Sequence, residues 1–207
     1  MDFSLTETQK MLRAMVREFA ERELEPIAAE IDEQARFPSE QIAKAAGLGL
    51  LGVAYPEKYG GGGGGKIEEI IVDEEIARVC ASVATIIFVT SGLAGKPIYE
   101  YSNEEQRQRF VVPIAEGRRL AAFALTEPAA GSDAAALETS ARKVAGGYML
   151  NGTKVFISNG AEADTFLVPP RHVSVFPLST TVSTNTAILW VRNESRVCMH
   201  SAIPPLC

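Results

Sequence analysis

Apolar residues recur with helical spacing through the first part of the chain. The i, i+3, i+4 and i+7 positions of one helix face are apolar near the N-terminus, at Leu12, Met15, Val16 and Phe19. Ser4 and Glu7 precede this face with the spacing of a capping box, which predicts that a helix begins there. Pro26 is expected to kink or end the helix, although Ile27 and Ile31 indicate that helical spacing continues beyond it.

Further helices are predicted downstream. Residues 82–95, SVATIIFVTSGLAG, are nearly all apolar or small, which favours a fully buried helix within a bundle. Their β-branched residues leave a strand as the alternative. A shorter helix is expected between Pro38 and Gly47, another is expected to begin near Lys66, and Asn103 is placed to cap an exposed one.

Six consecutive glycines, Gly60 to Gly65, follow a segment, residues 48–60, that is expected to be extended and irregular. A flexible loop between two helices is the structure that this composition favours. A phosphate cradle is the alternative, but neither a Walker-type Lys-Ser/Thr pair nor a clear preceding strand accompanies the run.

The pattern changes after Gly117 to short apolar runs separated by Gly146-Gly147 and by Asn151-Gly152, which is a strong hairpin signal. Five runs are predicted as strands: residues 120–128, Leu137 to Val144, Tyr148 to Leu150, Lys154 to Ile157, and Thr165 to Val168. The fold class that follows is α+β. A helical domain over residues 1–117 leads into antiparallel strands of a partial β-barrel over residues 118–168.

Composition and charge narrow the function classes. A net charge of −6 argues against a nucleic-acid-binding protein, because phosphate binding requires clustered Lys and Arg. The sequence contains no run of 18 uninterrupted apolar residues, so no membrane span is predicted. MDFSLTETQK lacks the features of a secretory or transit peptide. Three widely spaced cysteines predict neither a disulfide framework nor a zinc site, and a reducing compartment is expected. The first 168 residues contain no histidine, which excludes His-based metal sites and triads there.

The last 39 residues, 169–207, differ abruptly in composition. All 17 glycines precede residue 169, whereas this tail holds five of the 11 prolines and the single tryptophan. One explanation is an end of different origin, such as a shifted reading frame or an alternative splice. The other is a Ser/Thr-rich β segment, because TTVSTNTAILWV has good strand propensity. The prolines and the missing turn formers predict that the tail is less ordered than the preceding residues.

Two segments carry candidate chemistry. In FALTEPAAGSD, Phe123 to Asp133, a strand ends in a turn set by Pro128, and small residues let a ligand approach the backbone closely. Hydroxyls and free N–H groups in such a turn suit a pyrophosphate or the edge of a heteroaromatic ring. In NGTKVFISNG, a strand is expected to place Phe156 and Ser158 on one face, where they could flank a flat cofactor. An inward phenylalanine with an incidental serine is the alternative.

The order of these segments behind a helical region resembles the acyl-CoA dehydrogenase family, especially its short-chain, butyryl-CoA branch. The resemblance runs from Met1 to about Val168, and TEPxxGSD is a signature of that family. It includes MDFSLTETQKMLR, FAERELEPIAAEID, LGLLGVAYPEKYGG, DEEIARVCAS, NEEQRQRF, FALTEPAAGSD and LNGTKVFISNGAEAD.

The resemblance implies a flavoprotein oxidoreductase of fatty acid β-oxidation that binds FAD. The implied cofactor-binding residues are Phe123, Ala124, Leu125, Thr126, Glu127, Gly131, Ser132, Phe156, Ile157 and Ser158. Thr126 would hydrogen-bond the pyrimidine side of the flavin, Ser132 would contact both the FAD pyrophosphate and the acyl-CoA substrate, and Ser158 would lie near flavin N5. The Glu127 side chain is interpreted as structural rather than as the base.

Departures from the family are also informative. The loop after Tyr-Gly-Gly is polyglycine here, and the resemblance ends near Val168. The resemblance therefore implies that the rest of the barrel and the C-terminal helical bundle, which carries the catalytic Glu, are missing. No catalytic residue and no metal ligand is assigned.

The family context implies acyl-CoA as substrate, an electron-transferring flavoprotein as electron acceptor and a homotetramer, in the bacterial or archaeal cytoplasm or the mitochondrial matrix. A truncated chain without the base is expected to be inactive alone. The alternative is a non-catalytic fragment, either a helical interaction module or a chain without function.

Overall fold

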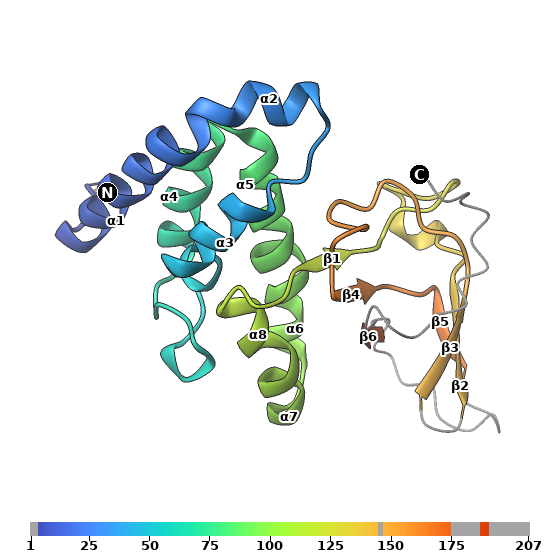
Figure 1. Cartoon of the computed structure of the whole chain (residues 1–207). Coiled ribbons are helices and arrows are strands. Elements are labelled where there is room, and N and C mark those ends of the chain that lie inside the picture. The colour runs from blue at the N-terminus through green and yellow to red at the C-terminus, as the bar shows by residue number, and fades with distance from the viewer. Residues whose placement is uncertain (1–3, 145–146, 175–186, 191–207) are drawn as a thin grey trace. The chain divides into compact units, whose positions relative to one another are not determined.

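The structure, a computed structural model, describes residues 4–144, 147–174 and 187–190. The chain divides into two compact units, residues 1–121 and residues 122–207. We call them the helical unit and the β unit, because helices make up the first and strands dominate the second (Figure 1). The fold class is therefore α+β, as the sequence predicted.

Helices of the helical unit are joined by short turns or by π-helical and 3-10 segments. A nearly continuous helical path contains α1 and α2, and a second contains α5 and α6. The bounds are α1 Glu7–Phe19, α2 Ala28–Glu33, α3 Ser39–Gly47, α4 Lys66–Ala77, α5 Ala81–Phe88, α6 Lys96–Tyr101, α7 Glu104–Gln106 and α8 Val112–Ala115. Residues 48–60, which the sequence predicted as extended and irregular, contain two 3-10 turns, Leu50–Gly52 and Glu57–Tyr59.

α1 begins later than the sequence predicted. The capping box is formed by Thr6 and Gln9, whose side chains each bond the other's backbone N–H, and not by Ser4 and Glu7. The predicted apolar face is real, since Val16 and Phe19 are buried. Pro26 lies in a 3-10 turn, and the chain resumes as α2 beyond it, as the spacing indicated.

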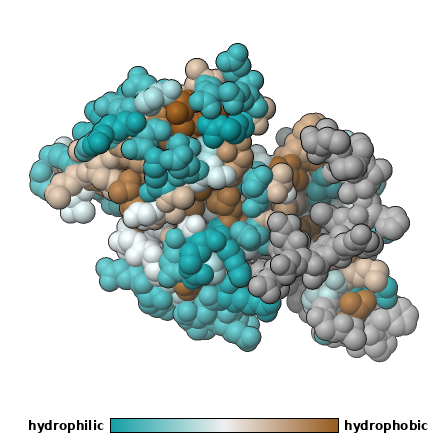
Figure 2. Space-filling model, viewed as in Figure 1, coloured by the Kyte–Doolittle hydropathy of each residue, from teal (hydrophilic) through white to brown (hydrophobic). Residues whose placement is uncertain are grey.

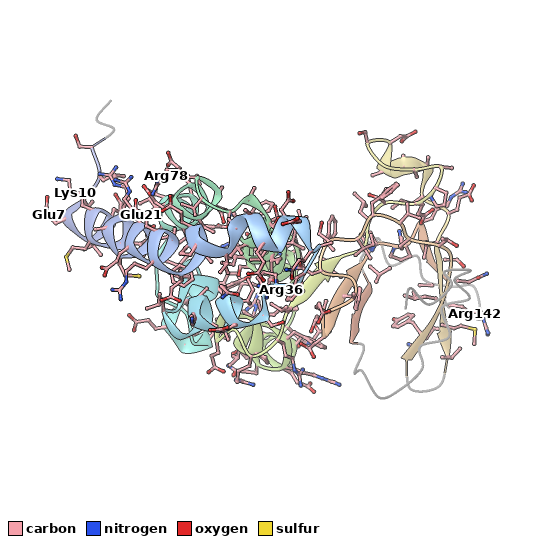
Figure 3. All side chains as sticks on the ribbon, turned by 45° about the horizontal axis from the view of Figure 1, so that its top comes forward. Glu7, Lys10, Glu21, Arg36, Arg78 and Arg142 are labelled. Atoms are coloured by element: carbon pink, nitrogen blue, oxygen red, sulfur yellow. The ribbon has the colours of Figure 1, made fainter. Side chains whose placement is uncertain are left out.

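α1 packs on α4, and ion pairs on the surface accompany that contact. The Arg17 guanidinium donates two hydrogen bonds to the nearly buried Glu75 carboxylate, at 2.8 and 2.7 Å. Glu21 and Arg78, labelled in Figure 3, lie beside each other at 2.8 Å. On the face shown in Figure 2, hydrophilic residues cover most of the helices and apolar residues show between them. The helical unit thus has the apolar interior and polar surface expected of packed amphipathic helices.

Residues 82–95 are helical, so the helix was the right choice over the strand, but the helix is not fully buried as predicted, because Phe88 and Leu93 are exposed. They run from α5 through a π-helical segment, Val89–Gly95, into α6. The whole helix, Ala81–Tyr101, is long and apolar enough to span a membrane by length and composition alone, which the apolar-run criterion did not detect. Half of its most apolar window is buried inside the protein, and core helices meet the same criterion.

The glycine run, Gly60 to Gly65, is a hydrogen-bonded loop rather than a flexible one, which corrects the sequence-based expectation. Backbone N–H groups of Gly62, Gly63 and Gly64 donate to carbonyl oxygens of residues 52–55 at 2.8–3.0 Å. A side chain at Gly61 would overlap the Tyr55 carbonyl group. Glycine is therefore required because two backbone segments approach closely, and not for flexibility.

Replacing Gly61 by alanine is expected to lower the free energy of unfolding by about 1–3 kcal/mol, the usual range for an overpacked site. The control is Gly47→Ala, because no heavy atom lies within 4 Å of a Cβ added there. That substitution is expected to leave stability unchanged or raised by up to about 1 kcal/mol. Urea unfolding followed by circular dichroism measures both. Equal stabilities of the two variants would show that the glycine run tolerates a side chain at residue 61.

The β unit contains two three-stranded sheets, with strand orders β1-β4-β6 and β3-β2-β5 in the described residues. The bounds are β1 Ala121–Phe123, β2 Ser140–Val144, β3 Gly147–Asn151, β4 Thr165–Val168, β5 His172–Ser174 and β6 Ala187–Trp190. β2 and β3 form an antiparallel hairpin with Val144 opposite Gly147, so the two strands are joined between these residues and not at Asn151-Gly152.

One expectation about the β unit was wrong. Residues 154–157 are not a strand, because the backbone bends at Phe156 and turns at residues 158–162. Beyond residue 168, where the sequence assigned no definite strand, β5 pairs with β2 in parallel. The chain leaves β4 and crosses to the other sheet within a few residues, where Arg171 N–H donates to Thr139 O at 2.7 Å.

Part of the compositionally distinct tail is structured. β5 and β6 both lie beyond residue 168, and β6 pairs antiparallel with β4 over Thr165–Val168. β6 falls in the stretch whose strand propensity suggested a β segment. The predicted low order of the tail falls mainly on residues 175–186 and 191–207, which lie outside the described residues.

Candidate functional site

The TEPAAGSD segment is a tight turn held against β4. Ala124 N–H donates to Leu167 O at 2.8 Å, which extends the pairing of β1 with β4. Glu127 and Ala130 then exchange two backbone hydrogen bonds, at 2.7 and 3.2 Å, around Pro128 and Ala129. Proline at this position presets the backbone angle of a β-turn, so the local sequence accounts for the turn.

The Glu127 carboxylate is buried beneath this turn, with 5% of its side chain exposed. It accepts hydrogen bonds from the N–H groups of Glu138, at 2.6 Å, and Thr139, at 3.0 Å, and from the Lys154 ammonium, at 2.9 Å. Burial alone would raise the pKa of Glu127, but the Thr139 hydroxyl, the Lys154 ammonium and the two N–H donors lower it to about 2. Because Thr139 Oγ1 makes no hydrogen bond of ordinary geometry, the two N–H groups and the Lys154 ammonium are the donors that keep the carboxylate ionised.

Lys154 is the residue that the sequence analysis overlooked. Its side chain is 7% exposed, and Nζ donates to Glu127 Oε1, to Leu125 O at 2.8 Å and to Pro169 O at 3.0 Å. A buried lysine needs such partners, because an unpaired charge away from water is costly. Two features of the sequence could have indicated this pair. Lys154 begins the otherwise apolar run KVFI, and the other candidate segment contains the acid Glu127.

Phe156 has the most unusual conformation at the site. Its φ angle is 56°, and the residue is 93% exposed. Positive φ is rare for a bulky residue and costs energy, so such outliers cluster at functional sites. Val155 N–H donates to Thr126 O at 2.9 Å just before it, and a hydrogen-bonded turn over residues 157–163 follows. Phe156 and Ser158 are thus presented by a bend rather than by one face of a strand.

The two candidate segments lie side by side, joined at residues 126 and 155 and at residues 127 and 154. The sequence-predicted residues differ in exposure. Ser132, Phe156 and Ser158 are exposed, Ala124 and Glu127 are buried, and Phe123, Leu125, Thr126, Gly131 and Ile157 are intermediate. Glu127 uses its carboxylate and both backbone polar groups internally, which suits a structural role and not direct contact with a cofactor.

The residues present fit a flat aromatic ligand. The exposed phenyl ring of Phe156 offers stacking area, and hydroxyls of Thr126, Ser132 and Ser158 are available nearby in the chain as hydrogen-bonding groups. Metal chemistry has no comparable support, because the described residues contain no group of three or more His, Cys, Asp or Glu side chains.

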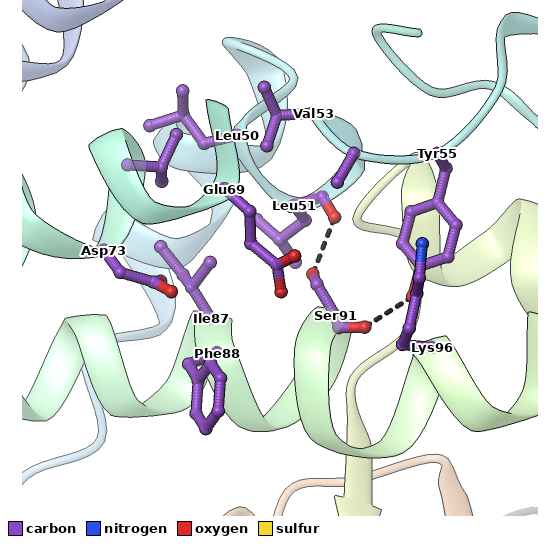
Figure 4. Close-up of a pocket in the computed structure, with 12 residues that line it drawn as sticks. Leu50, Leu51, Val53, Tyr55, Glu69, Asp73, Ile87, Phe88, Ser91 and Lys96 are labelled. Atoms are coloured by element: carbon purple, nitrogen blue, oxygen red, sulfur yellow. Dashed lines mark hydrogen bonds between the residues drawn. The ribbon is translucent and has the colours of Figure 1, made fainter. Parts of the chain in front are cut away.

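A second polar cluster lies in a cavity of the helical unit (Figure 4). Burial, and then the neighbouring Glu69 carboxylate, raise the pKa of Asp73 to about 6. Tyr55 Oη donates to Ser91 O, and Ser91 Oγ donates to Leu51 O at 2.6 Å. The accessible volume is about 10 Å³, which is room for one water molecule and not for a cofactor.

A helical unit followed by a β unit of two small sheets defines the chain as an α+β protein with two modules in this order. Two family models match it in that order: the acyl-CoA dehydrogenase N-terminal domain over residues 6–118 and the acyl-CoA dehydrogenase middle domain over residues 122–190. The chain belongs to the acyl-CoA dehydrogenase family. The middle-domain match continues past Val168 and includes β5 and β6.

Individual proteins agree with the family match. The short-chain acyl-CoA dehydrogenase of Clostridium acetobutylicum is 45% identical over 168 residues, covering 81% of this chain and 44% of that protein. A chain in the solved structure of the electron transferring flavoprotein of Acidaminococcus fermentans has a TM-score of 0.83 and 38% identity, covering 92% of this chain and 49% of that one.

The acyl-CoA dehydrogenase of Bacillus anthracis, solved in complex with FAD, has a TM-score of 0.77 and 35% identity, covering 82% of this chain and 30% of that one. The chain thus spans less than half the length of these relatives.

Proposed function

We propose that this chain forms the FAD-contacting part of an acyl-CoA dehydrogenase that acts on short-chain acyl-CoA. Family membership and the short-chain relative support the substrate class, and the relative solved with FAD supports the cofactor. The observation that carries the proposal is Phe156, an exposed residue with a strained backbone that directly follows the hydrogen-bonded Thr126–Val155 contact. A protein maintains such strain where the conformation is used.

Each residue has a proposed task toward the flavin. Phe156 packs its ring against the isoalloxazine, while Thr126 hydrogen-bonds the pyrimidine side and Ser158 holds its hydroxyl near N5. Ser132 contacts the pyrophosphate and the acyl-CoA. FAD supplies hydride acceptance at N5 when it is bound. The backbone of Phe123, Ala124, Leu125, Gly131 and Ile157 forms the remaining wall, and Glu127 supports the turn from behind.

The finer architecture is also proposed. The helical domain comprises residues 1–117, and the two sheets of the β unit form part of the family's middle-domain barrel. The carboxylate base of the reaction comes from residues outside this chain. The complete protein assembles as a homotetramer. The electrons pass to an electron-transferring flavoprotein, which the Acidaminococcus structure supports. The bacterial or archaeal cytoplasm or the mitochondrial matrix is the proposed location.

Binding of FAD to the 207-residue chain tests the proposal. Phe156→Ala is expected to weaken FAD binding about 10-fold, since stacking of a flat ring on an aromatic side chain is worth ~1–3 kcal/mol. Tyr148→Ala is the matched control, because Tyr148 is also an exposed aromatic residue of the β unit, on β3. Quenching of flavin fluorescence on titration measures both affinities.

A wild-type chain that binds no FAD at any accessible concentration would contradict the proposal and favour the non-catalytic alternative. Equal losses in the Phe156→Ala and Tyr148→Ala variants would place the flavin elsewhere in the β unit.

A further inference from the structure

The Lys154 ammonium joins three stretches of chain that are distant in sequence. Its acceptors are Leu125 O, Glu127 Oε1 and Pro169 O, so it bonds the turn after β1 and the segment after β4 at once. An ammonium has three hydrogens, and all three have an oxygen acceptor here. Because guanidinium or amide groups have other shapes, a lysine is the side chain that fits three convergent carbonyl and carboxylate oxygens.

The position of Lys154 matters as much as its contacts. Val155, the next residue, is fixed to Thr126 O by its N–H, and Phe156 follows immediately with its positive φ angle. On the other side, Gly160 N–H donates to Ile157 O at 3.0 Å and Ala163 N–H donates to Asn159 O at 2.8 Å. The strained bend is therefore held between an anchored residue and a hydrogen-bonded turn.

We propose that Lys154 is a positioning residue, which holds the Phe156–Ser158 bend against the Thr126–Ser132 turn so that the stacking surface exists before a ligand binds. Lys154 itself contacts no ligand; it acts through the backbone of residues 155 and 156. The inference rests on the proposed FAD site only for the identity of the ligand. Preorganisation of this kind lowers the ordering cost of binding and so raises affinity without a new contact.

The test compares three variants of the full chain with the wild type. Lys154→Met removes the ammonium, and Lys154→Met combined with Glu127→Gln removes both charges while the glutamine keeps an acceptor for the N–H groups of residues 138 and 139. Lys143→Met is the control, because Lys143 is an exposed lysine of β2. Amide hydrogen exchange is followed in residues 155–163 and, as an internal reference, in the β2–β3 hairpin. FAD affinity and urea unfolding are measured in parallel.

Lys154→Met is expected to speed exchange in residues 155–163 by ~10- to 100-fold relative to the hairpin, the effect of losing a hydrogen bond to a charged group. The double variant is expected to regain most of the lost resistance to urea, because no buried charge stays unpaired. Its bend should still exchange fast and bind FAD about 10-fold more weakly. A purely structural role predicts instead that order and affinity return together with stability.

Unchanged exchange in residues 155–163 of Lys154→Met, or recovery of both exchange and affinity in the double variant, would overturn the inference. If Lys154→Met does not fold, the double variant decides by the same two readouts. If the wild type binds no FAD, the proposed function fails, but the exchange comparison still decides whether Lys154 fixes the bend.

Discussion

Glu127→Gln is expected to lower the free energy of unfolding by about 3 kcal/mol at pH 7 and by much less near pH 2. The interactions that hold the pKa of Glu127 at about 2, against 4.5 ordinarily, stabilise the folded state whenever the carboxylate is ionised. A difference of ~2.5 pKa units corresponds to ~3 kcal/mol at 1.36 kcal/mol per unit. Because the folded pKa is depressed, this stabilisation is complete above pH 4.5 and is lost as the pH falls towards 2.

Glu138→Gln is the control for this prediction, because Glu138 is an exposed neighbour that supplies only its backbone N–H to Glu127. Denaturant unfolding at several pH values between 7 and 2 provides the measurement, and the difference between variant and wild type is the quantity of interest. A difference that does not change with pH would mean that Glu127 contributes shape alone and that its charge is immaterial.

No flavin reduction is expected within minutes when the 207-residue chain is mixed anaerobically with FAD and butyryl-CoA. Removal of the α-proton needs a base whose pKa lies near the working pH, and such catalysis contributes ~10²–10⁴-fold. Glu127, the carboxylate of the TEPAAGSD turn, is unsuitable, because it is buried, paired with Lys154 and too weak a base at a pKa of about 2. The oxidised-flavin absorption band should therefore persist.

Bleaching of that band within seconds would contradict this expectation. Glu194 is the only acidic side chain of residues 169–207. If Ser158→Ala or Glu194→Gln abolished the bleaching, a residue of this chain would be acting as the base or beside the flavin. Addition of free FAD without butyryl-CoA, and of butyryl-CoA without protein, controls for reduction that does not involve the site.

Local sequence predicted most of the helical unit because its signals are local. The 3.6-residue period located α1, and Asn103 caps α7 through a box with Gln106 as its position suggested. The prediction of a flexible loop at the glycine run failed for the opposite reason. Its order comes from backbone hydrogen bonds to residues 52–55, and no side-chain pattern records a contact between two backbones.

The site was predicted in part. Thr165–Val168 and the β2–β3 hairpin followed from alternation and glycine pairs, but the bend at Phe156 did not. KVFI has the composition of a strand, and strand propensity is overridden here by tertiary contacts. The lysine and the acid that supply those contacts are 27 residues apart. Pairing at that distance leaves no periodic pattern in the sequence. Glu127 was interpreted as structural, but its partner Lys154 was not predicted.

The burial of Lys154 also affects its chemical reactivity. A thioester acylates a lysine only through a free amine lone pair that it can reach, and the Lys154 nitrogen is enclosed with its three hydrogens directed at oxygen atoms. An exposed amine such as that of Lys143 has no such protection. Under the proposed function the chain works among acyl-CoA molecules, which are mild acylating agents, and the buried Lys154 amine lies out of their reach.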